Sequence, residues 1–406
     1  MIRELTIKYG NIIDKLVSEI KKDLSESGYG RDDEDLLSMV EDKFFSSDEI
    51  SNIDFDEVKP LINCIFKRVR DRFGVLSELL RNEDINEIMV NGYKEIYVEK
   101  KKKILKIDDS FTSEIELENL IRMFASDVHR EINEANPIVD ARLENGYRVN
   151  GVLKVIALNG PILTIRKFNK EAITMHKLIE LKSLTRECSD FLSMLVKCGY
   201  NIFISGGTSS GKTTFLNALS ESILPDERVI IIEDSAELKI EHIKNIVHME
   251  CRGANSIGRG EVNMASLIRT SLRMRPDRII VGEVRGKEVV DMIQAMNTGH
   301  SGSMSTGHGN SVKGMLSRLE TMYLMDSQIP MKSIKAQISN AVEIYVHLMR
   351  DKNGNRKVVE IAEMIGIKDD DYELNYLFVR NGEDELVRTK NKLINNEKLI
   401  RGQADV

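Results

Sequence analysis

The sequence of 406 residues has no tryptophan, and aromatic residues make up only 5% of it. A groove for single-stranded nucleic acid needs aromatic side chains for base stacking, so this composition argues against such a groove. No stretch approaches the roughly 18 consecutive apolar residues of a membrane-spanning helix. The opening segment, MIRELTIKYGNIIDKL, mixes both charges and lacks the apolar core of a signal peptide. These absences predict a cytoplasmic protein without a direct membrane span.

Cysteine is also scarce, with only four residues: Cys64, Cys188, Cys198 and Cys251. They are too scattered for a C-x-x-C metal site and too few for a disulfide scaffold, so we expect free, buried thiols. A surplus of positive charge is missing as well, because 58 basic side chains stand against 65 acidic ones and the net charge is −7. No global positive field therefore attracts nucleic acid or anionic lipid, although the net charge does not exclude a local basic patch.

The length predicts two or three domains of about 150 residues each. Three regions that differ in composition and residue pattern follow one another along the chain. Residues 1–74 are charged and helix-prone and predict a helical appendage, although a solvated charged segment explains residues 28–35 equally well. Residues 75–172 predict an α+β domain of short strands with a covering helix. Within it, the lysine run at 100–103 suits either a phosphate patch or, better, an exposed hairpin tip. Residues 173–406 alternate apolar strands with helices, which predicts a mostly parallel sheet covered on both faces.

The covering helix of the α+β region is expected in the segment SEIELENLIRMFASDVHREI. Its apolar positions Ile115, Leu120, Ile121 and Phe124 are compatible with one helical face. The dipeptide Asn-Gly at 91–92 predicts a hairpin turn between two strands upstream. Further strands are predicted in ARLENGYRVNGVLKVIAL and PILTIRKF downstream.

The string GGTSSGKTT fits the phosphate-binding pattern G-x-x-x-x-G-K-[ST]. The apolar strand NIFIS precedes it and a helix-compatible segment follows, so backbone N–H groups can converge on phosphate oxygens. Lys212 is expected to reach the β- and γ-phosphates, and the Thr213 hydroxyl to take one position on Mg²⁺. The predicted nucleotide-binding residues are Gly206, Gly207, Thr208, Ser209, Ser210, Gly211, Lys212, Thr213 and Thr214.

Hydrolysis also needs acidic residues that hold Mg²⁺ and orient water. The strand RVIIIED ends in Glu233 and Asp234, and the strand RIIVGEV carries Glu283 near its end. Because ligands gather at the carboxyl ends of parallel strands, these acids are expected to face the phosphate loop. Farther along, two Thr-Gly-His triplets contain His300 and His308, which could contact the γ-phosphate through a small-residue sensing loop or simply cap tight turns.

The order of these motifs resembles the secretion ATPase superfamily. The phosphate loop, the acidic strand end IIIEDSAEL, the second acidic box LRMRPDRIIVGEVRG and the histidine box MNTGHSGSMSTGHGNS follow one another as in its members. The run of GEVRG, DMIQAMNTGH and SRLETM is most similar to the CpaF/TadA family of Tad (Flp) pilus assembly ATPases. The segments EIMVNG, PIVDARLENGYRVNG and LTIRKF resemble the N-terminal domain of that family. The resemblance covers about residues 75–350.

The resemblance implies an α/β protein in which a RecA-like P-loop NTPase domain, residues 173–406, follows an α+β, PAS-like domain and a helical appendage. It implies an ATPase that uses ATP and Mg²⁺ and forms a homo-hexamer at the inner face of the cell membrane. Such a motor moves pilins through inner-membrane platform proteins. By the same resemblance, Glu233 and Glu283 share water activation and Mg²⁺ organisation, with Glu283 the stronger candidate. His300 and His308 match the histidine box.

Arg142, Arg148 and Arg166 match arginines that face the phosphates from the N-terminal domain in relatives. An arginine brought onto the transferring phosphoryl group stabilises its charge and makes hydrolysis depend on domain closure. A strand-face ion pair is the alternative for each, and it is the favoured one for Arg142.

The chain also departs from the family. GVLKVIALNGP lacks the paired prolines before LTIRKF, and STGHGNS stands where many relatives have an Ile and an Ala around the second histidine. The cysteine-rich metal insert of type II secretion relatives is not visible, so no zinc is predicted.

Three other functions compete with the pilus motor. A type IV secretion ATPase shares all four motifs and is the nearest alternative. A RecA-like nucleic-acid motor would use the same phosphate loop, but the acidic balance and few aromatics argue against it. A scaffold that binds nucleotide without turnover is disfavoured by the two strand-end acids.

Overall fold

The computed structural model describes residues 2–27, 33–47, 53–71, 73–100, 103–128, 130–143, 146–167, 173–254 and 259–404. It divides into two compact units, Met1–Phe168 and Asn169–Val406. The predicted three-part division of the chain stays a prediction. Part of the charged segment 28–35 and the lysines at 101 and 102 lie outside the described residues.

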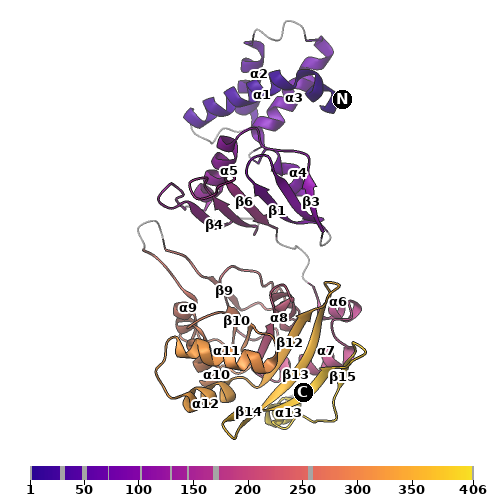
Figure 1. Ribbon diagram of the computed structural model, residues 1–406, viewed down its shortest axis with the longest axis vertical. Helices are drawn as coiled ribbons and strands as arrows, with labels where there is room; N and C mark the ends of the chain where they lie inside the picture. The colour runs from indigo at the N-terminus through magenta and orange to yellow at the C-terminus, as the bar shows by residue number, and fades with distance from the viewer. Residues whose placement is uncertain are drawn as a thin grey trace. The chain divides into compact units, whose positions relative to one another are not determined.

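The first unit begins with a bundle of three helices (Figure 1). The helices of this unit are α1 (Ile2–Ser27), α2 (Asp33–Phe45), α3 (Phe55–Arg70), α4 (Leu76–Arg81) and α5 (Glu114–Asp127). The apolar residues Leu16, Ile20 and Leu24 of α1 are buried together with residues of α2 and α3. The three helices therefore share a hydrophobic core.

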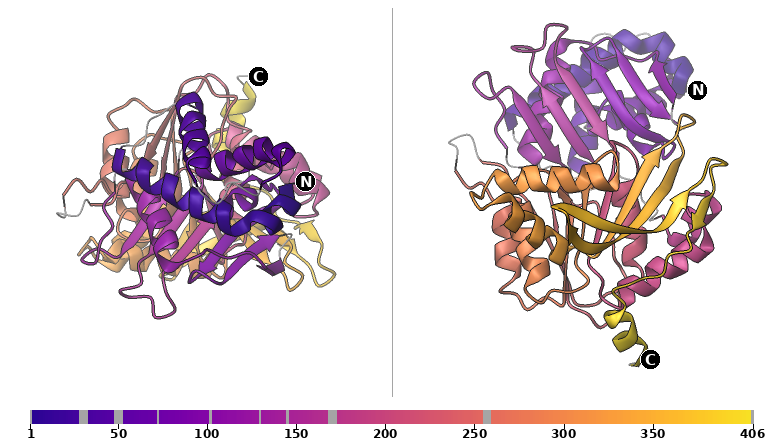
Figure 2. Two further views of the ribbon diagram at one scale, coloured as in Figure 1. Left: turned by 90° about the horizontal axis from the view of Figure 1, so that it is seen from above. Right: turned by 60° about the horizontal axis from the view of Figure 1, so that its bottom comes forward.

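An antiparallel sheet follows, and its strands lie side by side in Figure 2, right. The strands are β1 (Ile85–Asn91), β2 (Ile96–Lys100), β3 (Lys103–Ile107), β4 (Ile138–Arg142), β5 (Arg148–Val152) and β6 (Ile162–Arg166), in the order β3-β2-β1-β6-β5-β4. Helix α5 covers one face, where Ile121 and Phe124 share a core with Val149 and Leu163. The predicted turn is present, and Gly92 adopts φ +71°, a conformation that favours glycine.

Two sequence predictions in this unit are wrong. Ile115 is 70% exposed, because at 100° per residue it lies opposite Phe124 on helix α5 and not beside it. The apolar run after β5 does not continue as a strand: Val155 and Leu158 are exposed in a series of turns, with Ala157 N–H bonded to the Lys154 carbonyl. An apolar run without alternation does not distinguish a strand from an exposed turn.

The second unit is built on a sheet of mixed direction. Its strands are β7 (Ile202–Gly206), β8 (Val229–Glu233), β9 (Ile246–Glu250), β10 (Arg278–Val284), β11 (Met304–His308), β12 (Ile344–Arg350), β13 (Arg356–Lys368), β14 (Asp371–Arg380) and β15 (Leu386–Arg388). They are ordered β15-β14-β13-β12-β7-β11-β10-β8-β9. The part from β12 to β9 is parallel, and β13 to β15 add antiparallel strands at one side.

Helices cover both faces of this sheet, as the apolar strands predict. They are α6 (Met175–Glu180), α7 (Arg186–Lys197), α8 (Lys212–Ser220), α9 (Met264–Ser271), α10 (Val289–Asn297), α11 (Val312–Leu324), α12 (Met331–Ala341) and α13 (Glu397–Ala404). One core joins α6, α7 and α8 to the sheet, and a second joins α9 to α12 to its other face (Figure 1). The α/β prediction for this region is confirmed. Across the described ranges, no helix is long and apolar enough to cross a membrane.

Candidate nucleotide site

The predicted phosphate loop joins the central strand β7 to helix α8. Gly206 must be a glycine because neighbouring atoms lie too close for a side chain. A Cβ there would lie 2.4 Å from Ser210 Oγ and 2.6 Å from the Leu348 carbonyl oxygen. Gly211 has φ +91° and caps helix α8 without any side-chain acceptor for the first N–H groups. Ser209 also takes a left-handed conformation, with φ +58°. The loop therefore leaves helix N–H groups available to an anion.

Lys212 is the first residue of α8, and its side chain is only 7% exposed. Its Nζ donates to the Gly207 carbonyl at 3.2 Å and lies 3.3 Å from His308 Nδ1. Glu283 Oε1 is 3.9 Å away. Burial lowers the pKa of Lys212, and the Glu283 carboxylate opposes that shift. The ammonium group is held under the loop, where the phosphates of a nucleotide would bind.

His308 lies beside Lys212 because part of the segment predicted to be a sensing loop forms a strand. Residues 304–308 form β11, which lies between β7 and β10, and His308 is paired with Gly206. Its Nε2 lies 2.8 Å from Glu283 Oε1 while Nδ1 faces Lys212. A neutral ring that accepts from Lys212 at Nδ1 must carry its proton on Nε2, the ring nitrogen beside Glu283 Oε1. Burial lowers the pKa of His308, which favours this neutral form.

Glu283 lies at an irregularity in strand β10. The pairing of β10 with β11 shifts between Val281 and Val284, and the Thr306 hydroxyl donates to the Gly282 carbonyl there at 2.8 Å. Such a bulge re-aims a side chain, and here it directs Glu283 toward His308. Arg285 holds the other carboxylate oxygen, donating to Oε2 from Nε at 3.0 Å and from Nη2 at 2.7 Å.

Glu233 occupies a different environment at the end of β8. It is 3% exposed, and its carboxylate accepts the backbone N–H groups of Glu237 at 2.9 Å and Leu238 at 3.1 Å. A Cβ on Gly282 would lie 2.9 Å from Glu233 Cγ, so the side chain is also packed tightly. This carboxylate is engaged in holding the loop after β8, whereas Glu283 faces Lys212.

His300 is not brought to this edge of the sheet. It precedes strand β11, so it lies at the opposite end of that strand from His308. Its Nδ1 is 3.2 Å from the Ala295 carbonyl, and its own carbonyl accepts the Ser303 hydroxyl. Within one chain the ring of His300 therefore serves a turn beside helix α10.

The three predicted arginines form one row on the sheet of the first unit. Arg142 is paired with Arg148, and Arg148 with Arg166, across β4, β5 and β6. Residues directly opposite in a sheet point to the same face. Helix α5 covers the other face, where Val149 and Ile165 are buried. The three predicted arginines therefore lie together on the face of the sheet that helix α5 does not cover.

The sequence analysis missed two residues next to the phosphate loop. Arg356 on β13 donates from Nε to the Ser209 carbonyl at 3.2 Å, and its stem lies over Gly211. His347 on β12 lies 2.9 Å from Ser205 Oγ, directly before the loop. Neither belongs to a recognisable local motif. They reach the loop because β12 pairs with β7, and that long-range pairing cannot be read from local spacing.

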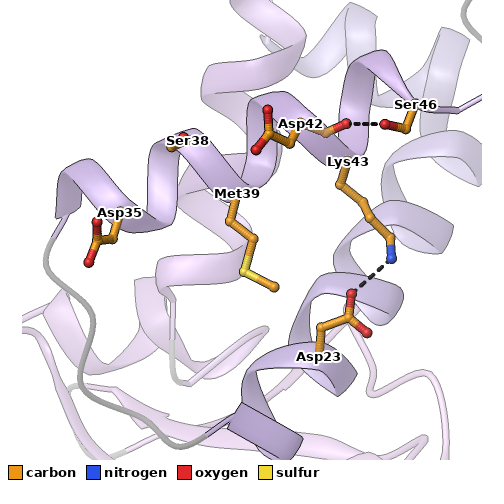
Figure 3. A pocket seen from close by; sticks show the side chains of 7 residues that line it. All are labelled: Asp23, Asp35, Ser38, Met39, Asp42, Lys43 and Ser46. Atoms are coloured by element: carbon orange, nitrogen blue, oxygen red, sulfur yellow. Dashed lines mark hydrogen bonds and ion pairs between the residues drawn. The ribbon is translucent and has the colours of Figure 1, made fainter.

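A hollow of about 560 Å³ also lies between helices α1 and α2 (Figure 3). A Lys43–Asp23 ion pair of 2.8 Å spans it. Its lining residues are Asp23, Asp35, Ser38, Met39, Asp42, Lys43 and Ser46. In the described part of the chain, no three or more His, Cys, Asp or Glu side chains are grouped so that they could hold a metal ion.

The loop also passes a test of fit for a triphosphate. The buried ammonium of Lys212 and the uncapped N-terminus of α8 supply positive charge and N–H donors, which suit phosphate oxygens. Thr213, in the first turn of α8, and Glu283 offer the oxygen ligands that Mg²⁺ prefers. A parallel sheet with this loop after its central strand and an acid and a histidine at neighbouring strand ends defines a P-loop nucleoside triphosphatase.

The sequence pattern of the family described as "Type II/IV secretion system protein" matches residues 70–376. The chain belongs to this family. It is 31% identical over 320 residues to the conjugal transfer protein TrbB of Rhizobium radiobacter, covering 77% of this chain and 94% of that one. It is 32% identical over 309 residues to the type IV secretion system protein PtlH of Bordetella pertussis, covering 70% and 91%.

A solved structure supports the fold. The crystal structure of the pilus retraction motor PilT with bound ADP matches with a TM-score of 0.54 and 19% identity, covering 81% of this chain and 86% of that chain. At this identity the likeness concerns the fold alone. The RecA-like P-loop ATPase fold expected from the sequence is thereby confirmed.

Proposed function

We propose that the chain is an ATP-hydrolysing motor subunit of a pilus or secretion machine. The observation that carries the proposal is the series Lys212, His308 and Glu283 at the mouth of the phosphate loop, with 3.3 Å and 2.8 Å between neighbouring groups. Lys212 and the loop N–H groups bind the phosphates. Thr213 and Glu283 would hold Mg²⁺, which would neutralise phosphate charge. The carboxylate of Glu283 orients the attacking water as general base.

His308 and Arg285 fix the Glu283 carboxylate from two sides. A carboxylate held by two partners keeps one orientation, which favours alignment with the attacking water. Glu233 is assigned a supporting role, because backbone N–H groups already occupy its oxygens. We assign the arginine row of the first unit a role in stabilising the transferring phosphoryl group.

We further propose a homo-hexamer of the Tad (Flp) pilus assembly type that acts on inner-membrane platform proteins at the inner face of the cell membrane. The motifs GEVRG, DMIQAMNTGH and SRLETM support this subtype. The alternative is a type IV secretion ATPase, which is favoured by the names of the relatives TrbB and PtlH. A platform membrane protein and a small pilin encoded beside this chain would support the pilus subtype, and conjugation genes there would support the alternative.

The activity is tested by measuring phosphate release from ATP and Mg²⁺, with and without single-stranded DNA. We expect turnover that DNA leaves unchanged, because the chain has a net charge of −7 and few aromatic side chains. Strong stimulation by DNA would contradict a pilus motor. A verified hexamer without any turnover would instead identify a nucleotide-dependent scaffold.

A further inference from the structure

His347 is a buried histidine behind the phosphate loop, and the proposed mechanism does not use it. It is 5% exposed and lies on β12, directly opposite Ser205 of β7. Ser205 is the last residue before the loop glycine Gly206 and is completely buried. The Ser205 hydroxyl lies 2.9 Å from His347 Nδ1. The ring therefore contacts the base of the loop from within the sheet.

The same ring faces two further segments. The backbone of Asn310, two residues after His308, lies close enough to the ring to raise the pKa of His347. Glu360 of β13 is paired with His347 across the strands, and its Oε1 accepts the N–H of Val312 at 2.8 Å, at the start of α11. The base of the loop, the segment after His308 and the start of α11 thus meet around one side chain.

A serine, a histidine and a glutamate in this order resemble a hydrolytic triad, but burial excludes that role. Ser205 is 0% exposed and His347 is 5% exposed, so no substrate reaches the hydroxyl. A neutral imidazole has one acceptor nitrogen, and Nδ1 of His347 can accept the hydrogen of the Ser205 hydroxyl. Burial lowers the pKa of His347, which keeps the ring neutral.

We propose that His347 is a positioning residue that sets the spacing between the phosphate loop and His308. This inference rests on the proposed ATP hydrolysis. The segment of His308 is otherwise joined to the loop by strand pairing and by a Gly309 N–H bond of 3.3 Å to the Gly206 carbonyl. His347 binds the loop side of that junction through Ser205, and its cross-strand neighbour Glu360 binds the N–H of Val312 on the other side. Loss of His347 loosens the alignment of His308 and Glu283 with Lys212 while the cradle of backbone N–H groups remains.

The test compares His347→Phe, His347→Asn, Ser205→Ala and a matched control in the full-length chain. Phe keeps a buried ring but removes the ring hydrogen bond to Ser205, whereas Asn keeps an acceptor close to the position of Nδ1. The control is Tyr345→Phe, on the same strand face, because the buried Tyr345 hydroxyl has no hydrogen-bond partner among the described residues. Circular dichroism and thermal unfolding first establish which variants fold.

We expect His347→Phe to lower kcat by up to about a hundredfold, the effect of misplacing groups by about 1 Å. The Kd of a fluorescent ATP analogue should stay within about threefold, since the cradle is spared. Ser205→Ala should show a smaller loss of the same kind, and His347→Asn a partial recovery. Without nucleotide, hydrogen exchange of residues 304–312 should be faster in His347→Phe but unchanged in Tyr345→Phe.

An unchanged kcat and exchange rate in a folded His347→Phe or Ser205→Ala variant would overturn the inference. So would a parallel loss of kcat and analogue affinity, because that result indicates mere support of the fold. If the unaltered protein turns over ATP no faster than the Lys212→Ala variant, the proposed function is refuted instead. In that case the exchange measurement, which needs no turnover, still decides whether His347 holds this segment.

Discussion

The Nε2 atom of His308 lies 2.8 Å from Oε1 of Glu283, although 25 positions separate the two residues in the chain. Strand β11 makes this contact, since it enters the sheet between the strand of the phosphate loop and the strand of Glu283. The histidine thereby joins the anion-binding lysine to the candidate base. This relationship leads to the predictions for the site.

Lys212→Ala should abolish nucleotide binding or turnover. The ammonium supplies charge-assisted hydrogen bonds to phosphate, each of about 1.5–3 kcal/mol, so affinity should fall at least about tenfold. Calorimetric titration with ATP and Mg²⁺ measures the affinity. Lys244→Ala, at an exposed lysine, is the control and should bind as the unaltered protein does. Unaltered turnover in Lys212→Ala would refute the phosphate-loop assignment.

Glu283→Gln should keep the affinity for ATP within about threefold and lower kcat by at least about a hundredfold. The amide of Gln has nearly the shape of the carboxylate and its oxygen can still accept from Arg285, so the geometry is retained while the base is lost. Steady-state kinetics and analogue binding separate the two effects. Glu233→Gln is the matched control. If that variant loses kcat and Glu283→Gln does not, the general base is Glu233.

Arg148→Gln should lower turnover more than it lowers stability. Arg148 stands between Arg142 and Arg166 on one face of the sheet. Loss of an arginine on the transferring phosphoryl group lowers kcat by about a thousandfold or more. Urea unfolding and kinetics of the full chain give both quantities. Arg148→Lys keeps the charge but not the planar fork and should recover little activity. A clear loss of stability with normal kcat would indicate a structural ion pair instead.

Acidification should destabilise the second unit between neutral pH and mildly acidic pH. Burial lowers the pKa of His308 and His347 below the ordinary 6.5. The unfolded chain therefore takes up protons at these side chains before the folded chain does, and stability is lost as the pH falls below about 6.5. Above that value both states are neutral and the effect vanishes.

Urea midpoints at about pH 7.5 and about pH 5.5 measure the loss, because carboxylates with ordinary pKa values titrate mainly below this window. The double variant His308→Asn, His347→Asn should show a smaller difference between the two midpoints. An equal difference would assign the pH dependence to other groups.

Much of the fold follows from local sequence patterns. The apolar strand before GGTSSGKTT and the glycines within it predict the strand, the loop and the helix, because each depends on neighbouring residues alone. The error at Ile115 has a local cause, a wrong helical phase. The error after β5 arises because the apolar run there lies in an exposed turn, and nothing in the run itself shows this.

The candidate site was only partly predictable. Lys212 lies in the phosphate-loop motif, Glu283 in the second acidic box and His308 in the histidine box. Their mutual distances depend on strand order, and β11 lies between β7 and β10 although it follows both in the chain. The same order leaves His300 at the far end of β11 and brings Arg356 to Ser209.

The sequence by itself determined the class of chemistry, because a phosphate cradle needs glycines, a lysine and a hydroxyl residue at fixed local spacing. It also determined the three arginines as candidates. Only the tertiary structure decided which acid faces the lysine, which histidine joins them and that the arginines form one row. Those relations are set by the long-range pairing and packing of strands, which local spacing does not encode.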